Sequence, residues 1–162
     1  MAKEFTSEQG YRPRDLLHAS IDHLDAAQIL FEHGPRTLDS AGYLSHLGIE
    51  LLLKALLLDR NDRFPSTHDL HDLLSKVEES GALLDLSAEH LETVALLDQF
   101  SSLRYPLLGG SPPIGSEHWR PIHLLRREII LQSPALKAAL SDINPTEKFG
   151  RVLLRKPKNP AA

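Results

Sequence analysis

The sequence contains no cysteine, and this absence excludes several kinds of chemistry at once. Disulfides, thiolate nucleophiles, thiolate zinc sites and cysteine-held iron–sulfur clusters all require that side chain. The chain has 162 residues, and one domain typically needs about 100–200, so a single domain with a full core is expected. A composition of 41% hydrophobic and 25% charged residues argues against wholesale disorder.

Long apolar segments are also missing. The longest mostly apolar run, residues 51–58, is interrupted by Lys54 and is too short to cross a bilayer, which needs about 20 residues. The first eight residues lack the apolar core of a secretory signal. We therefore expect a soluble, cytoplasmic protein with no membrane partner.

Valine and threonine are scarce, and leucine and alanine dominate. There are 3 Val and 5 Thr against 32 Leu and 14 Ala, which favours helices over strands. Apolar residues at helical spacing, together with the positions of proline, predict helices over residues 13–33, 39–59, 68–80, 88–104 and 121–132, the last continuing to 140 beyond Ser133-Pro134. The predicted fold is all-α, an up-and-down bundle of four to five helices over residues 1–140, followed by an irregular basic tail over 141–162.

Two glycines lie inside the predicted helix 39–59. Gly42 and Gly48 each cost about 1 kcal/mol relative to alanine in a helix interior. We interpret them as places where a neighbouring helix approaches closely.

Charge is unevenly distributed along the chain. Residues 1–102 hold 8 basic and 18 acidic residues, a net charge of −10, whereas residues 103–162 hold 10 basic and 4 acidic, a net charge of +6. Clustered cations can bind phosphate. A solubilising tail and a solvated helix face would give the same pattern, so both interpretations stay open.

Motifs for metals and nucleotides are weak or missing. His68 and His71 share a helix face, with Asp69 and Asp72 beside them. These positions also begin a helix, where polar groups are favoured for other reasons, and a metal site needs a fuller ligand set. No GxGxxG, Walker or GxSxG motif occurs. We predict no metal and no cofactor.

The segment Phe100-Ser101-Ser102-Leu103-Arg104-Tyr105-Pro106 combines a guanidinium and a phenol at the expected end of the helix 88–104. Arg104 could bind a phosphate bidentately, and Tyr105 could stack on a base. Alternatively, Arg104 could cap helix carbonyls and pair with an acid such as Glu50.

Four segments in a fixed order resemble the HEPN superfamily of small helical bundles. They are Ala19-Ser20-Ile21-Asp22-His23-Leu24, the helix containing Glu50 and Lys54-Ala55-Leu56, then Thr67-His68-Asp69-Leu70, and Leu103-Arg104-Tyr105-Pro106. The resemblance covers roughly residues 14–106. It implies a homodimeric helical bundle associated with RNA or nucleotides, in which Arg104, Tyr105, Glu50 and Lys54 contribute to binding. A minimal nucleotidyltransferase partner, in a toxin–antitoxin or defence context, is also implied.

The resemblance further implies a possible enzyme. Active family members are metal-independent ribonucleases with an arginine followed, after four to six residues, by a histidine. Arg104 matches that arginine, but the expected window holds Gly109, Gly110 and Ser111, and the next histidine is His118. His118 or His46 would then be the candidate base.

Three hypotheses follow. The first is a non-catalytic dimer that binds RNA, a nucleotide or a nucleotidyltransferase partner. The second is a divergent ribonuclease using Arg104 with His118 or His46. The third is a helical scaffold with no role in nucleic-acid chemistry. We rank the first above the second.

Overall fold

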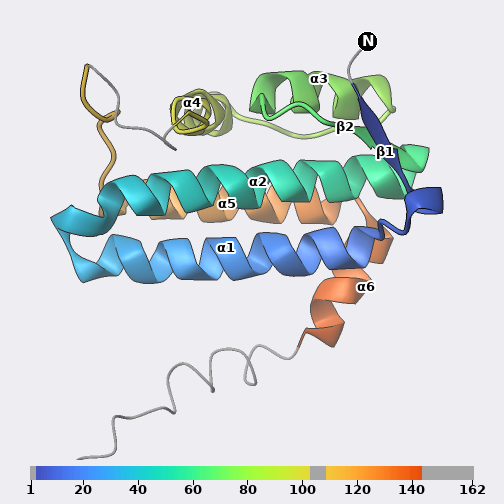
Figure 1. Ribbon diagram of the computed structural model, residues 1–162, viewed down its shortest axis with the longest axis horizontal. Coiled ribbons are helices and arrows are strands. Elements are labelled where there is room, and N and C mark those ends of the chain that lie inside the picture. The colour runs from blue at the N-terminus through green and yellow to red at the C-terminus, as the bar shows by residue number, and fades with distance from the viewer. Residues whose placement is uncertain (1–2, 103–108, 144–162) are drawn as a thin grey trace, which may run out of the picture.

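The computed structural model describes residues 3–102 and 109–143, and it confirms the all-α class (Figure 1). The helices are α1 (Pro13–His33), α2 (Leu38–Asn61), α3 (Leu70–Glu79), α4 (Ala88–Asp98), α5 (Trp119–Leu131) and α6 (Pro134–Asp142). In Figure 1, α1 and α2 run lengthwise with α5 behind them, and α3 and α4 lie on the opposite side of α2 from α1. α4 is seen almost end-on, so it crosses α2 steeply.

The central helix is α2. Fourteen of its residues are buried, including all of residues 52–58. The helical stretch Pro35–Asn61 is long and apolar enough to cross a membrane by length and composition, but 78% of its apolar window is buried within the bundle. That burial is what a helix packed on several sides by α1, α3, α4 and α5 shows.

Both glycines of α2 lie at close contacts, but the predicted neighbouring helix is present only at Gly48, whereas Gly42 meets a side chain from the turn after α4. A Cβ atom built on Gly48 would come within 2.5 Å of the Leu24 side chain on α1. A Cβ atom on Gly42 would come within 2.5 Å of the Phe100 ring, just beyond α4. Ser20 reinforces the first contact, because its hydroxyl donates a 2.6 Å hydrogen bond to the Gly48 carbonyl.

The boundaries of α3 and α4 differ from the prediction. α3 begins at Leu70 rather than at His68, and its N-cap is Asp69, whose carboxylate accepts a hydrogen bond from the Asp72 amide. α4 ends at Asp98 instead of continuing to residue 104. Beyond Asp98 the chain tightens into turns, in which the amides of Gln99, Phe100 and Ser101 bond to carbonyls three residues earlier, and the Phe100 ring is buried against Gly42.

A two-stranded antiparallel sheet, which the sequence analysis did not predict, lies at the edge of the bundle. β1 (Glu4–Thr6) pairs with β2 (Arg63–Pro65). Strands of three residues are too short to show an alternating pattern. The rings of Phe5, Tyr11 and Phe64 pack together around this pairing, with centroids 5.3–5.4 Å apart.

Helices α5 and α6 complete the bundle. α5 begins at Trp119, two residues before Pro121, and α6 extends to Asp142, two residues past the predicted boundary at 140. Ser133 between them accepts a hydrogen bond from the Leu136 amide and donates one of 2.7 Å to the Asp59 carboxylate. This contact joins the α5–α6 corner to α2. The predicted basic tail lies, from residue 144 on, outside the described residues.

Candidate functional site

The most concentrated set of buried ionisable groups in the described residues surrounds Glu50, in the middle of α2. Glu50 is only 4% exposed. One turn later, the Lys54 ammonium donates a 2.7 Å hydrogen bond to Glu50 Oε1. One turn earlier, His46 Nε2 lies 3.4 Å from Glu50 Oε2. The spacing of four residues places all three side chains on one face of the helix. We call these three residues and His68, described below, the Glu50 cluster.

Glu50 is ionised at neutral pH. Burial raises the pKa of this carboxyl, but contacts with His46, Lys54 and His68 outweigh burial and lower the pKa to about 2. A buried carboxylate is tolerated only when it is paired. Lys54 supplies the opposite charge, and its ammonium also lies 5.9 Å from the centre of the Phe64 ring.

His46 connects the cluster to α4. It is 1% exposed, and its Nδ1 lies 3.0 Å from the Leu97 carbonyl oxygen. Because a carbonyl only accepts, Nδ1 carries the proton. Its burial removes His46 from the side chains that could touch RNA as a general base. Its Nε2 faces Glu50 Oε2 at 3.4 Å, and neither atom has a hydrogen-bond partner in the described part of the chain.

His68 is the part of the cluster that reaches the surface. Its Nδ1 lies 2.9 Å from Glu50 Oε1, yet 65% of its side chain is exposed. Since the ionised carboxylate can only accept, Nδ1–H is the donor. In the neutral ring, the lone pair is therefore on Nε2, at the exposed side of the molecule. A buried carboxylate that fixes the tautomer of an exposed imidazole is an arrangement suited to proton transfer or hydrogen bonding.

A second carboxylate–histidine pair lies beside the first. His71 Nδ1 is 2.6 Å from Asp98 Oδ2, and Asp98 also accepts hydrogen bonds from the amides of Leu70 and His71, at 2.8 and 3.3 Å. Ligand atoms of Asp69, His71 and Asp98 lie within 4.8 Å of one another. The Asp69 and Asp98 carboxylates bind the first amides of α3, which have no partner within the helix. Capping of α3 therefore accounts for this group.

Among the remaining predicted site residues, the structure describes only His118, which is not part of the cluster. His118 belongs to a 3₁₀ turn, Ser116–His118, where its Nδ1 accepts a 2.9 Å hydrogen bond from the Gly115 amide. Arg104 and Tyr105 lie outside the described residues, two and three positions after Ser102. The structure thus brings together His46, Glu50 and Lys54, and it adds His68.

The comparison with family models decides the family. A model described as the HEPN domain matches residues 13–110, more than half of the chain. This chain belongs to the HEPN domain family. The matched region contains the complete Glu50 cluster and Arg104. HEPN modules are generally related to RNA. No curated protein and no solved structure matches the chain.

In the sequence, His68 stands out as a possible metal ligand and as part of the family-like segment Thr67-His68-Asp69-Leu70, but not as a partner of Glu50. The helical spacing of His46, Glu50 and Lys54 is visible in the sequence, but His68 joins them across 18 residues of chain. A histidine immediately before a helix N-cap, following a helix with a buried acid, is the only local signal that could have suggested the contact.

Proposed function

We propose that this HEPN module binds single-stranded RNA or a nucleotide and that His68 and Arg104 both contribute to binding. The observation that carries the proposal is the Glu50–His68 contact, in which a buried, ionised carboxylate holds an exposed imidazole in one tautomer. Membership of a family generally related to RNA supports the same ligand class.

Each proposed contact uses ordinary nucleic-acid chemistry. His68 Nε2 would accept a hydrogen bond from a ribose hydroxyl or a base edge, because the Nδ1 proton is already bound to Glu50. Arg104 would bind a phosphate through two parallel N–H donors. Tyr105 would stack on an unpaired base, a contact that tolerates many sequences.

The test measures fluorescence anisotropy of a short, fluorescein-labelled single-stranded RNA titrated with the full chain. We expect binding at low salt that weakens as salt is added, because phosphate contacts release counterions. Arg104→Ala and His68→Ala should each weaken binding, Arg104→Ala by about tenfold, equivalent to about 1.4 kcal/mol.

His71→Ala is the matched control. His71 is also a half-exposed histidine on a carboxylate near the start of α3, but that carboxylate caps the helix. Binding should therefore be unchanged in this variant. Absence of binding at low salt, or equal losses in the two histidine variants, contradicts the proposal.

A metal-independent ribonuclease is the second candidate, and the orientation of His68 favours it specifically. Nε2 of His68 would remove the proton from a ribose 2′-hydroxyl. The oxygen would attack the adjacent phosphorus, and the bond from phosphorus to the 5′-oxygen would break. That oxygen would take a proton from solvent water, and the hydroxide formed would remove the proton that His68 gained. The products are a 2′,3′-cyclic phosphate and a 5′-hydroxyl. This assigns the base to His68 instead of His118 or His46.

Cleavage of labelled single-stranded RNA in the presence of EDTA tests this second function. His68→Ala should reduce the rate by about 10²–10⁴-fold, the usual contribution of a general base. His71→Ala and His118→Ala should leave the rate within about twofold, which is far below that contribution. If cleavage is lost in His118→Ala but kept in His68→Ala, the general base is His118 and this assignment is wrong.

We also propose that the module acts as a homodimer and that a minimal nucleotidyltransferase is its protein partner. Light scattering coupled to size-exclusion chromatography measures the mass directly. A monomer at high micromolar concentration contradicts a dimer. Co-purification of the two proteins from a shared expression plasmid tests the partner, and independent elution contradicts it.

A further inference from the structure

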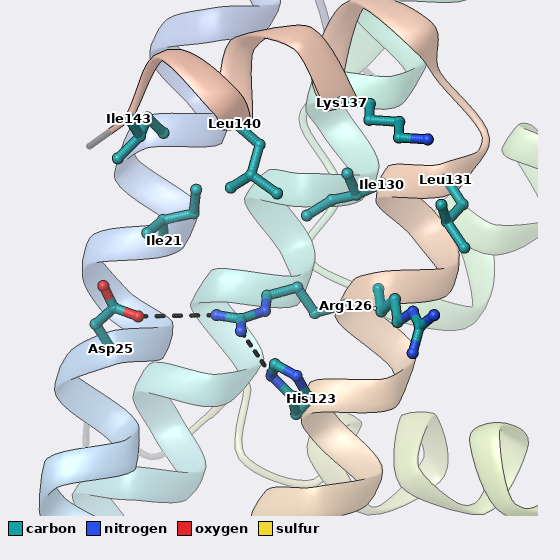
Figure 2. A pocket seen from close by; sticks show the side chains of 10 residues that line it. Ile21, Asp25, His123, Arg126, Ile130, Leu131, Lys137, Leu140 and Ile143 are labelled. Atoms are coloured by element: carbon teal, nitrogen blue, oxygen red, sulfur yellow. Dashed lines mark hydrogen bonds and ion pairs between the residues drawn. The ribbon is translucent and has the colours of Figure 1, made fainter. Parts of the chain in front are cut away.

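A pocket of about 370 Å³ lies between α1, α5 and α6, and none of its lining residues belongs to the Glu50 cluster. Small-molecule sites typically have volumes of about 300–1,000 Å³. Its apolar lining consists of aliphatic side chains only: Ile21, Ile130, Leu131, Leu140 and Ile143. Figure 2 shows the side chains of Ile21, Ile130 and Leu140 gathered on one side of the pocket.

Arg126 separates this aliphatic region from the polar end of the pocket. Its guanidinium lies 3.7 Å from the Asp25 carboxylate and donates a 2.6 Å hydrogen bond to His123 Nδ1 (Figure 2). The arginine side chain is only 19% exposed and passes 6.0 Å from the Trp119 ring. These contacts hold the guanidinium in one place before any ligand arrives, which reduces the entropy lost on binding.

Positive charge exceeds negative charge around the opening. Arg126, Arg127 and Lys137 line the pocket together with a single carboxylate, that of Asp25. His123 accepts a hydrogen bond at Nδ1, and burial and the neighbouring arginines lower its pKa, so it adds no charge at neutral pH. The formal balance is three cations against one anion.

We infer that this pocket binds a small amphipathic anion, an aliphatic chain ending in a carboxylate. The chain would lie against Ile21, Ile130 and Leu140, and the carboxylate would lie toward the exposed Arg127 and Lys137, since Arg126 is already paired with Asp25 and His123. An aliphatic ligand fits better than a nucleobase, because the lining offers no aromatic side chain for stacking apart from His123 and no amide or hydroxyl side chain to read a base edge.

Charge also argues against two other occupants of the pocket: the chain's own residues 144–162 and a second copy of the protein. Residues 144–162, which follow Ile143 directly, contain one acidic residue, Glu147, and five basic ones: Lys148, Arg151, Arg155, Lys156 and Lys158. Its net positive charge is unfavourable next to Arg126, Arg127 and Lys137 at the opening of the pocket. A second copy docked face to face would bring the Arg127 and Lys137 side chains of both copies together, which is unfavourable for the same reason.

The test titrates the full chain with sodium decanoate, below the concentration at which it forms micelles, by isothermal titration calorimetry. We expect saturable binding that decanol and inorganic phosphate each reproduce only weakly, since one lacks the charge and the other the chain. A double variant, Arg127→Gln with Lys137→Gln, should bind decanoate about tenfold less tightly. Both positions are exposed, so the fold is preserved.

Arg120→Gln is the matched control, because Arg120 is an exposed arginine on the same helix that does not line the pocket. Absence of saturable binding, or equal affinity in the double variant and in this control, overturns the proposal. Tighter decanoate binding in a Leu153→Asp, Leu154→Asp variant would assign the pocket to residues 144–162 and overturn it as well. RNA binding is measured separately at the Glu50 cluster, so the two proposals fail independently.

Discussion

The start of α3 carries two carboxylate–histidine pairs that look alike and serve different purposes. Asp98 binds His71 and also the amides of Leu70 and His71, so its oxygens fasten α4 to the first turn of α3. Glu50 contacts side chains only: Lys54 and His68 donate hydrogen bonds to its Oε1, and His46 Nε2 lies 3.4 Å from its Oε2. The side chain of Asp98 is 18% exposed and that of Glu50 is 5% exposed.

The difference lies in what would satisfy each carboxylate if its histidine were absent. Asp98 would keep two backbone donors and partial access to water. Glu50 would keep only the hydrogen bond from Lys54, which is itself buried. The Asp98–His71 pair is therefore mainly a cap of α3. In the Glu50–His68 pair, a buried charge contacts an exposed histidine.

The largest expected effect is on stability when Glu50 loses its charge. Glu50→Gln leaves the Lys54 ammonium, which is 5% exposed, without an anion. We expect a loss of about 3–5 kcal/mol in the free energy of unfolding, the usual cost of an unpaired buried charge. Urea denaturation measures this loss. Adding Lys54→Met should restore most of it, and a double variant as unstable as the single one contradicts the ion-pair explanation.

The next largest expected effect is the loss of stability that the Glu50 pair shows at acid pH. The pKa of Glu50 is lowered from 4.5 to about 2, so in that window the unfolded chain binds more protons than the folded chain. Stability from Glu50 is complete above about pH 4.5 and is lost as the pH falls toward 2, by about 3 kcal/mol in total. Urea curves at a series of pH values measure it. In the Glu50→Gln, Lys54→Met variant this part of the pH dependence should disappear, and an unchanged slope would refute it.

A moderate effect is expected at Asp98. Asp98→Ala removes the acceptor for two amides that have no partner within α3, and it should cost about 1–2 kcal/mol, as loss of a helix cap does. Asp98→Asn retains one acceptor oxygen and should lie in between. RNA affinity should be the same in both variants as in the unmodified protein. A large loss of RNA affinity would mean that the second pair also belongs to the binding surface.

The smallest effects on stability are expected for the two histidines. Their side chains are 65% and 56% exposed, and half-exposed ion pairs contribute about 0–1 kcal/mol. His68→Ala and His71→Ala should therefore unfold at nearly the same urea concentration while differing in RNA affinity. A large difference in stability between them would show that His68 is structural.

These two pairs also show how far the sequence alone leads. Helix positions, the central place of α2 and the packing role of Gly48 follow from leucine spacing, proline positions and the cost of glycine in a helix. The end of α4 could not be read in this way, since residues 99–104 contain no proline or glycine that would mark it.

The partners of the site residues could be predicted only within one helix. His46, Glu50 and Lys54 share a face of α2 by spacing, and the sequence analysis selected all three. The contacts of Glu50 with His68 and of Asp98 with His71 join residues 18 and 27 positions apart. Such pairings are set by how the helices pack. The residues next to His68 and His71 in the sequence do not indicate which acid each histidine contacts.

The close contact between Gly42 and the Phe100 ring restricts which residues can occupy these two positions. Because the Phe100 ring occupies the volume of the missing side chain, neither position can change size alone without a clash or a hole. Among related sequences, a larger residue at 42 should be accompanied by a smaller one at 100. We therefore expect the residues at positions 42 and 100 to covary.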